Sequence, residues 1–215
     1  MLKLLRSKHI MKAIFWALVI LILPAFVLFG TGSIGRPSGE KGPSYAGTID
    51  NKKVTFDEFA DSITSLRCQI TLNLFNQPQA LEAILKNKPL MGKMAWDRLI
   101  MAREAAKLKI KVKNDEVVTY IRSHPIFARG GRFDEGIYGY VLRNNLGLYP
   151  RNFEEIVRES LAIKKSNDLI TKDVKAADEK ELEKKKNEFL EDWLRKRESA
   201  AKTNIDFNDY EKYYR

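Results

Sequence analysis

The stretch Thr55-Phe-Asp-Glu-Phe-Ala-Asp-Ser-Ile-Thr-Ser-Leu-Arg-Cys-Gln-Ile70 decides the fold class of this chain of 215 residues. Thr55 and Glu58 are spaced for a capping box, in which each side chain accepts a hydrogen bond from the other residue's backbone N–H. The apolar residues recur three or four positions apart, which places them on one helix face: Phe56, Phe59, Ile63, Leu66 and Ile70. The stretch therefore predicts a capped helix that packs one face into a core.

Helical signals continue through the rest of the chain. Pro78 is expected to end the first helix, and residues 79–108 are predicted to be mostly helical with a break near Lys88-Pro89. Four later helix starts are predicted from capping or first-turn residues, namely Asn114, Asp134, Pro150 and Asp178. The helix that follows Asp134 is expected to end at Gly147. These signals predict a mainly α fold.

Short extended segments lie near both ends of the predicted helical domain. Ala46–Ile49 and Lys52–Val54 read as two short strands around an Asp50-Asn51 turn. Ile205–Phe207 reads as a final strand without a partner nearby in the sequence. An unpaired strand would leave backbone groups without hydrogen bonds. We therefore expect Ile205–Phe207 to pair with Ala46–Ile49, so that a small β element joins the two ends of the domain.

An apolar run near the amino terminus predicts a membrane anchor. Ala13–Gly30 contains 18 residues, and no charged residue occurs between Lys12 and Arg36. As a helix this run would span about 27 Å, close to the roughly 30 Å of a bilayer's hydrocarbon core. Because basic residues are concentrated before the run, the positive-inside rule places Met1 in the cytoplasm. The expected location is a bacterial inner membrane, crossed once, with the carboxyl-terminal domain in the periplasm.

A cleaved signal peptide is the alternative for the same run. Gly30 and Gly32 would suit cleavage before Ser33, although the run is longer than the usual signal core of about 7–15 residues, which favours a retained anchor. The residues that follow are rich in Gly, Pro and Ser and predict a flexible tether with a reach of roughly 20 Å. The predicted order is a cytoplasmic basic segment over 1–12, a transmembrane helix over 13–30, the tether over 31–45, and a periplasmic helical domain over 46–215 that residues 176–215 close.

Composition argues against several kinds of chemistry. A single Cys and two His residues exclude an intramolecular disulfide and a Cys-rich zinc site. We expect no catalytic residues, no metal and no cofactor. Lys and Arg total 38 against 28 Asp and Glu, but the bases alternate with acids along helices and no nucleic-acid-binding signature occurs. Nucleic acid is therefore not an expected partner.

Large flexible apolar residues gather within one segment and point to apolar partners. Methionine is flexible and polarizable, which suits a surface that accepts varied apolar side chains. The alternative for each of these residues is that it fills the domain's own core. The predicted peptide-binding residues are Leu90, Met91, Met94, Trp96, Met101 and Phe127.

An ordered set of motifs resembles the N-terminal chaperone domain of SurA and PpiD proteins. The motifs are Pro125-Ile-Phe127, Gly131-Arg-Phe-Asp134, Tyr138, Leu142, Pro150-Arg-Asn-Phe-Glu-Glu155 and Val157-Arg-Glu-Ser-Leu161. The short basic amino terminus and single anchor look like the PpiD arrangement in particular. The resemblance covers most of residues 1–170 and, more weakly, the segment around Phe189-Leu-Glu-Asp-Trp-Leu-Arg195.

The resemblance implies a periplasmic folding helper that holds unfolded envelope or outer-membrane polypeptides. Proteins of this kind often carry a parvulin prolyl isomerase domain, for which residues 171–178 leave no room. We therefore expect a chaperone-like protein without catalysis. Its expected partners are unfolded polypeptides, inner-membrane lipid and, as a further candidate, the secretion translocon. The alternatives are an anchored adaptor for one folded envelope-assembly partner and a diverged peptidyl-prolyl isomerase.

Overall fold

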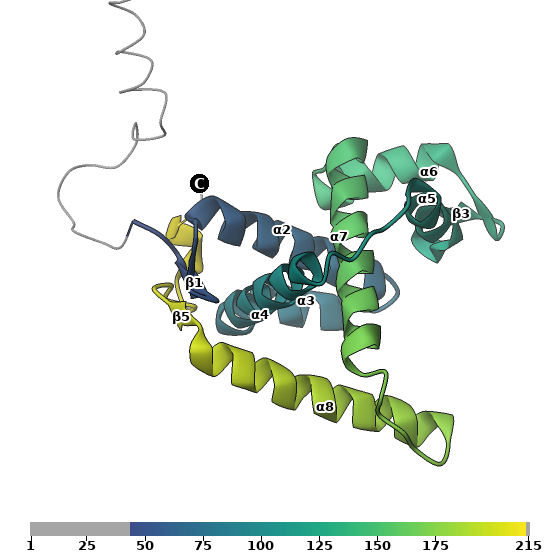
Figure 1. Ribbon diagram of the computed structural model, residues 1–215. Coiled ribbons are helices and arrows are strands. Elements are labelled where there is room, and N and C mark those ends of the chain that lie inside the picture. The colour runs from purple at the N-terminus through teal and green to yellow at the C-terminus, as the bar shows by residue number, and fades with distance from the viewer. Residues whose placement is uncertain (1–43, 214–215) are drawn as a thin grey trace, which may run out of the picture. The chain divides into compact units, whose positions relative to one another are not determined.

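Two short strands and a long helix open residues 44–213, the part of the chain that the computed structural model describes (Figure 1). Strands β1 (Gly47–Ile49) and β2 (Lys52–Val54) pair antiparallel around the predicted two-residue turn. Helix α2 (Phe56–Asn73) follows with its capping box in place. Glu58 N donates to Thr55 Oγ1 at 3.1 Å, and Thr55 N donates to Glu58 Oε2 at 2.7 Å. The hairpin and the capped helix were both predicted correctly.

Helices α3 (Pro78–Lys86) and α4 (Lys88–Lys107) confirm the predicted break within the next helical segment. Asn87 lies at the break and caps α4 by accepting a hydrogen bond from Leu90 N at 3.2 Å. The prediction for Pro78 was wrong, since α2 already ends at Asn73 and Pro78 is the first residue of α3. Proline suits a first helical turn because its fixed φ is helical and that turn needs no N–H donor.

The helices of the second half begin where the sequence predicts, but Asn114 is the first residue of α5 (Asn114–Ser123) and not its cap as predicted, since the cap is Lys113. Asp134 caps α6 (Glu135–Tyr140) by accepting a hydrogen bond from Ile137 N at 2.9 Å, and Gly147 ends the helical run in the left-handed conformation with φ 65°. Gly130 and Gly131 form the turn of a small hairpin. The elements are α5 (Asn114–Ser123), η2 (Pro125–Phe127), β3 (Ala128–Arg129), β4 (Arg132–Phe133), α6 (Glu135–Tyr140), the π-helical η3 (Val141–Leu146) and α7 (Pro150–Ile170).

The carboxyl-terminal segment closes the domain as predicted, but with different residues. After α8 (Glu179–Ala200), strand β5 (Lys202–Thr203) pairs antiparallel with β1 and makes a three-stranded sheet in the order β2-β1-β5. The predicted strand Ile205–Phe207 is therefore wrong by three residues. After Asn204 N donates to Ala46 O at 2.8 Å, the chain leaves the sheet and Ile205 fills the core. The chain then reaches η4 (Tyr210–Tyr213).

Buried apolar residues form two separate clusters. We call the first the closing core, because it joins residues from both ends of the described chain: Ala46, Ile49, Val54, Phe59, Ile63, Leu66, Ile70, Met91, Ala95, Trp96, Leu99, Ile100, Ile205 and Tyr210. We call the second the aromatic core, because aromatic rings pack in and around it. Its buried members are Cys68, Leu72, Val117, Ile121, Phe127, Val141, Leu142, Phe153 and Val157. Helix α2 contributes to both clusters and so connects them.

The predicted membrane helix lies outside the described residues. The same holds for the basic segment over residues 1–12 and for most of the tether over residues 31–45. Within residues 44–213, no helix has the length and apolar character that crossing a bilayer requires.

Candidate polypeptide-binding site

Helix α4 packs against α7 on one side and against α8 on another. Towards α7, Arg98 Nη2 lies 3.3 Å from Ser160 Oγ and 3.4 Å from Glu159 Oε2. Towards α8, Glu104 Oε2 accepts a hydrogen bond from Arg197 Nη2 at 2.7 Å. Figure 1 shows α7 crossing near α4 while α8 runs along the lower side of the domain. These contacts fix which side of α4 meets each neighbouring helix.

Three of the predicted peptide-binding residues lie on the edge of α4 between these two contact sides. At about 3.6 residues per turn, Leu90, Met94 and Met101 fall between Arg98, which faces α7, and Glu104, which faces α8. Met94 and Met101 are half-buried, and Leu90 is 38% exposed. We call these three residues the methionine edge of α4. Within this edge, Met94 packs against the closing core, whereas Leu90 and Met101 belong to neither core.

A recess of about 500 Å³ lies between the last turns of α7 and the first half of α8. Leu182 and Leu190 give it apolar surface, while Asn167, Lys186 and their neighbours give it a polar rim. Two large apolar side chains on the same helices are also exposed, Leu169 at 43% and Phe189 at 45%. We call this site the α7–α8 recess. The residues that line it are Lys164, Asn167, Asp168, Thr171, Glu179, Leu182, Glu183, Lys186, Asn187 and Leu190.

The other three predicted residues are core residues in this structure. Met91 and Trp96 belong to the closing core, and Phe127 belongs to the aromatic core. Met91 and Phe127 are fully buried because α4 is covered on most of its circumference and because Phe127 packs edge-to-face on Tyr138 and Phe153. The alternative that such residues fill the core therefore describes these three, and peptide contact by the methionine edge stays a prediction.

Sequence reasoning did not assign Leu182 and Leu190 to the binding site. A signal for them was present, because α8 repeats apolar residues on one face that continues beyond the part that packs on the closing core. Trp193 and Leu194 belong to the packed part, whereas Leu182 and Leu190 line the recess. The apolar residues of the mostly charged α8 therefore indicate two things: where the helix packs on the closing core and where it lines the recess.

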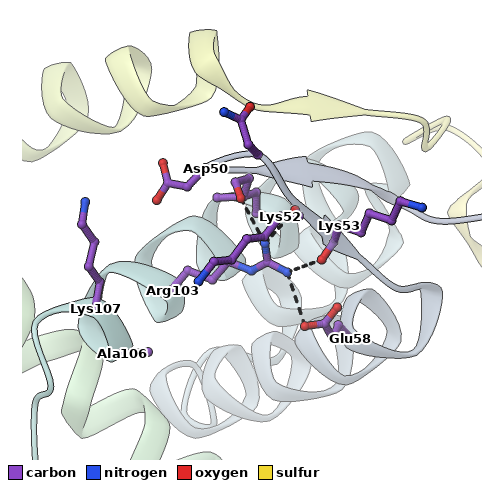
Figure 2. Close-up of a pocket in the computed structure, with 9 residues that line it drawn as sticks. Asp50, Lys52, Lys53, Glu58, Arg103, Ala106 and Lys107 are labelled. Carbon is purple, nitrogen blue, oxygen red and sulfur yellow. Dashed lines mark hydrogen bonds and ion pairs between the residues drawn. The ribbon is translucent and has the colours of Figure 1, made fainter.

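A larger recess of about 950 Å³ is lined in part by Arg103, which fixes the amino-terminal hairpin (Figure 2). Arg103 Nη1 donates to the carbonyl oxygens of Ile49 at 3.2 Å and Lys52 at 3.0 Å. Its Nη2 donates to Lys53 O at 2.8 Å and also contacts Glu58 Oε1 at 3.4 Å. Both terminal nitrogens of the guanidinium group are thus engaged with the hairpin and with the start of α2. We assign Arg103 a structural role, because its donors hold β1 and β2 against α4.

The reactive side chains of the described residues are placed for packing. Cys68 is buried, and burial raises the pKa of its thiol to about 12, which keeps it protonated at neutral pH. The His124 ring lies among the rings of Phe75, Tyr120 and Phe127, with centroids 5.7 to 5.9 Å apart. Burial lowers the pKa of His124. Among residues 44–213, no three His, Cys, Asp or Glu side chains are grouped to hold a metal ion.

The SurA-like N-terminal domain family matches residues 1–167, which is more than half of the chain. The chain belongs to this family. The resemblance to the N-terminal domain of SurA and PpiD proteins is thereby confirmed. The match includes α2 to α6 and most of α7. Helix α8 and strand β5 lie beyond the matched residues. The closing segment is therefore seen in the structure and not in the family match. No curated protein and no solved structure matches the chain.

Proposed function

We propose that this SurA-like domain is a membrane-anchored, periplasmic, chaperone-like protein that holds unfolded or newly translocated envelope polypeptides without catalysis. Membership of the family supports a chaperone-like role. The observation that carries the proposal is the combination of the α7–α8 recess with the methionine edge of α4. Both offer apolar surface near charged side chains, on helices of which α4 and α8 pack against the closing core and α7 packs in the aromatic core.

Holding follows from the chemistry of these side chains. An unfolded segment can place an apolar side chain against Leu182, Leu190 or Met101 and remove both surfaces from water. The charged side chains around the recess, such as Lys186 and Glu183, remain hydrated and limit how much area is buried. Contacts that bury little apolar area release readily, and methionine adapts to side chains of different shape. The expected binding is therefore weak, reversible and tolerant of sequence.

Anchoring at the membrane is part of the same proposal. It rests on the apolar run Ala13–Gly30, on the basic residues before it and on the Gly-, Pro- and Ser-rich tether that follows. An anchored domain on a tether of roughly 20 Å would work close to emerging polypeptides. Inner-membrane lipid and the secretion translocon are the corresponding proposed partners.

The test is suppression of aggregation by the full-length chain in lipid nanodiscs. A chemically unfolded outer-membrane protein is diluted into buffer, and light scattering is recorded with and without the chain. We expect the chain to slow aggregation at near-stoichiometric amounts, whereas empty nanodiscs should not. Met101→Glu places a charge on the methionine edge and should weaken the effect several-fold, because burial of an unpaired charge opposes apolar contact. No suppression at a large excess of the chain would contradict the proposal.

Val118→Glu is the matched control, because Val118 is 47% exposed on α5 and lies outside both the methionine edge of α4 and the α7–α8 recess. This variant should suppress aggregation as well as the unmodified chain. Equal losses for Met101→Glu and Val118→Glu would argue against binding at the methionine edge. A proline-isomerisation assay on a model peptide separates holding from catalysis, and we expect the uncatalysed rate.

A further inference from the structure

Three charged side chains meet where α8 lies against α4. Lys93 and Asp97 lie one turn apart on α4, and Glu198 lies near the end of α8. The Lys93 Nζ atom is 2.7 Å from Asp97 Oδ2 and 2.7 Å from Glu198 Oε1. The two carboxylates therefore share one ammonium group. If both are ionised, the cluster carries one uncompensated negative charge at the contact between the helices.

The other cations around the cluster form their ion pairs with carboxylates outside it. On α8, Arg197 bonds Glu104 of α4 and Asp50 of the hairpin, and Arg195 acts on Glu198 from a distance. On α4, Arg98 follows Asp97 in sequence but pairs with Glu159 of α7. Within the described part of the chain, Lys93 is thus the one cation within 4.0 Å of Asp97.

Asp97 is poorly placed to remain ionised. Its side chain is 14% exposed, and no hydrogen-bond donor among residues 44–213 reaches its buried Oδ1 atom. Burial, together with the neighbouring Glu198 carboxylate, raises the pKa of Asp97 to about 7. The hydrogen bond with Asp97 and the ammonium of Lys93 hold the pKa of Glu198 below its usual range. Near neutral pH, Asp97 is therefore the group that exchanges a proton while Glu198 stays ionised.

We propose that Asp97 and Glu198 make the attachment of α8 to α4 dependent on a proton, and that this attachment regulates the α7–α8 recess. With the proton present, Lys93 balances Glu198, and a neutral Asp97 faces the carboxylate. Once the proton is lost, two carboxylates repel each other across one cation and a buried carboxylate oxygen lacks a donor. Because α8 forms one wall of the recess, its release changes the binding surface. This last step rests on the proposed function.

The direction of the pH dependence follows from the raised pKa of Asp97. Its pKa is raised in the attached state above the ordinary value of 3.8, so that attached α8 binds more protons than detached α8 between pH 3.8 and about 7. Attachment is therefore strongest in acid and weakens as the pH rises through about 7. Above that range both states have lost the proton, and the dependence ends.

Hydrogen–deuterium exchange of the α8 amides tests the attachment without any bound polypeptide. The full-length chain in nanodiscs is compared at about pH 5.5 and about pH 8, after correction for intrinsic exchange rates. The opening equilibrium of α8 should be about 30-fold larger at the higher pH. Asp97→Asn mimics the protonated group and should keep α8 protected at both pH values. Glu191→Gln, at an exposed position of α8, is the matched control and should retain the full dependence.

Two results would overturn the proposal. One is protection of α8 in the unmodified chain that does not change with pH, and the other is a pH dependence that survives in Asp97→Asn. If Asp97→Asn fails to fold, Glu198→Gln serves instead. It removes the repelling carboxylate, so the pH dependence must shrink while Lys93 still pairs with Asp97. An unchanged dependence in Glu198→Gln would likewise overturn the proposal.

Binding of an unfolded outer-membrane protein at the same two pH values separates regulation of the recess from the holding function itself. A pH-dependent affinity that becomes constant in Asp97→Asn supports regulation of the recess. A mobile α8 with unchanged affinity would overturn that regulation alone. Absence of binding at both pH values would instead contradict the proposed function, while the exchange data would still decide whether the carboxylate pair controls α8.

Discussion

The closing core and the aromatic core differ in how far apart in the sequence their residues lie. The closing core brings residues 46–70 and 91–100 together with residues 205–210, so its last members arrive from the far end of the domain. The aromatic core takes residues 117–157 as one continuous stretch and adds only the end of α2. One core therefore depends on long-range pairing, and the other depends mainly on caps, turns and helices that form locally.

The largest expected effect comes from removing a ring at the centre of the aromatic core. Phe127 is fully buried and packs edge-to-face on Tyr138 and Phe153, with centroids 5.2 and 5.6 Å away. Phe127→Ala should lower the free energy of unfolding by about 3–5 kcal/mol, because it leaves a cavity that the surrounding rings cannot fill. Chemical denaturation measures this change. Tyr140→Ala is the control, since Tyr140 is 61% exposed and should change stability by under about 0.5 kcal/mol.

A smaller effect is expected where the two ends of the chain meet. A Cβ atom at Gly47 would lie 2.2 Å from the carbonyl oxygen of Lys202 and 2.5 Å from the Trp96 ring. Gly47→Ala should therefore separate β1 from β5 and cost about 1–3 kcal/mol. Hydrogen–deuterium exchange of the backbone amides should rise first in β5 and α8. Gly139→Ala in α6 has room for the methyl group and should stabilise by up to about 1 kcal/mol, so equal effects of the two substitutions would contradict this comparison.

Helix caps should contribute about equally in the two regions. Thr55 caps α2 beside the closing core, and Asp134 caps α6 beside the aromatic core. Each substitution by Ala should cost about 1 kcal/mol, because one backbone N–H loses its acceptor. Denaturation of the two single variants and the double variant checks this. The costs should add, since the caps share no partner, and a strongly non-additive pair would mean that the two regions do not respond independently.

Acidification should have opposite local effects in the two regions. Burial lowers the pKa of His124, so the unfolded chain binds its proton near pH 6.5 while the folded aromatic region still holds a neutral ring. The His124 contribution to stability is therefore complete above about pH 6.5 and is lost as the pH falls through the lower folded value. Exchange of α5 amides should then increase in acid, whereas that of α8 should decrease.

His124→Asn is the control for this effect, because its Oδ1 atom can replace the Nδ1 atom that accepts the hydrogen bond from Ile126 N at 3.3 Å. An amide does not titrate in this range, so the acid-dependent exchange of α5 should disappear. If the variant kept that dependence, another group would have to be responsible.

Local signals predicted the part of the fold that local contacts determine. The caps at Thr55, Asp134 and Asp178, the first-turn Pro150 and the terminating Gly147 were all placed correctly from the sequence. Each acts through hydrogen bonds or dihedral preferences within a few residues of itself. This is why the organisation of the aromatic region could be read before the structure was known.

Long-range packing determined what the sequence could not predict. The closing strand was displaced by three residues, because nothing near Lys202 indicates that its partner in the sheet is Thr48. Met91 and Trp96 were predicted in a binding site but are buried, because neighbouring helices cover α4 on several sides. No sequence pattern pairs Asp97 with Glu198, which are brought together only when α8 packs on α4.

Site-specific photo-crosslinking measures the central claim most directly. A photoreactive amino acid is placed at Met101, at Leu190 or at the control position Val118 of the full-length chain in nanodiscs, and an unfolded outer-membrane protein is added before irradiation. We predict strong crosslinks from Met101 and Leu190 and few from Val118. Excess unfolded polypeptide should compete for the site and reduce the crosslinks from Met101 and Leu190. Equal crosslinking at all three positions, or none at Met101 and Leu190, would contradict polypeptide holding between α4, α7 and α8.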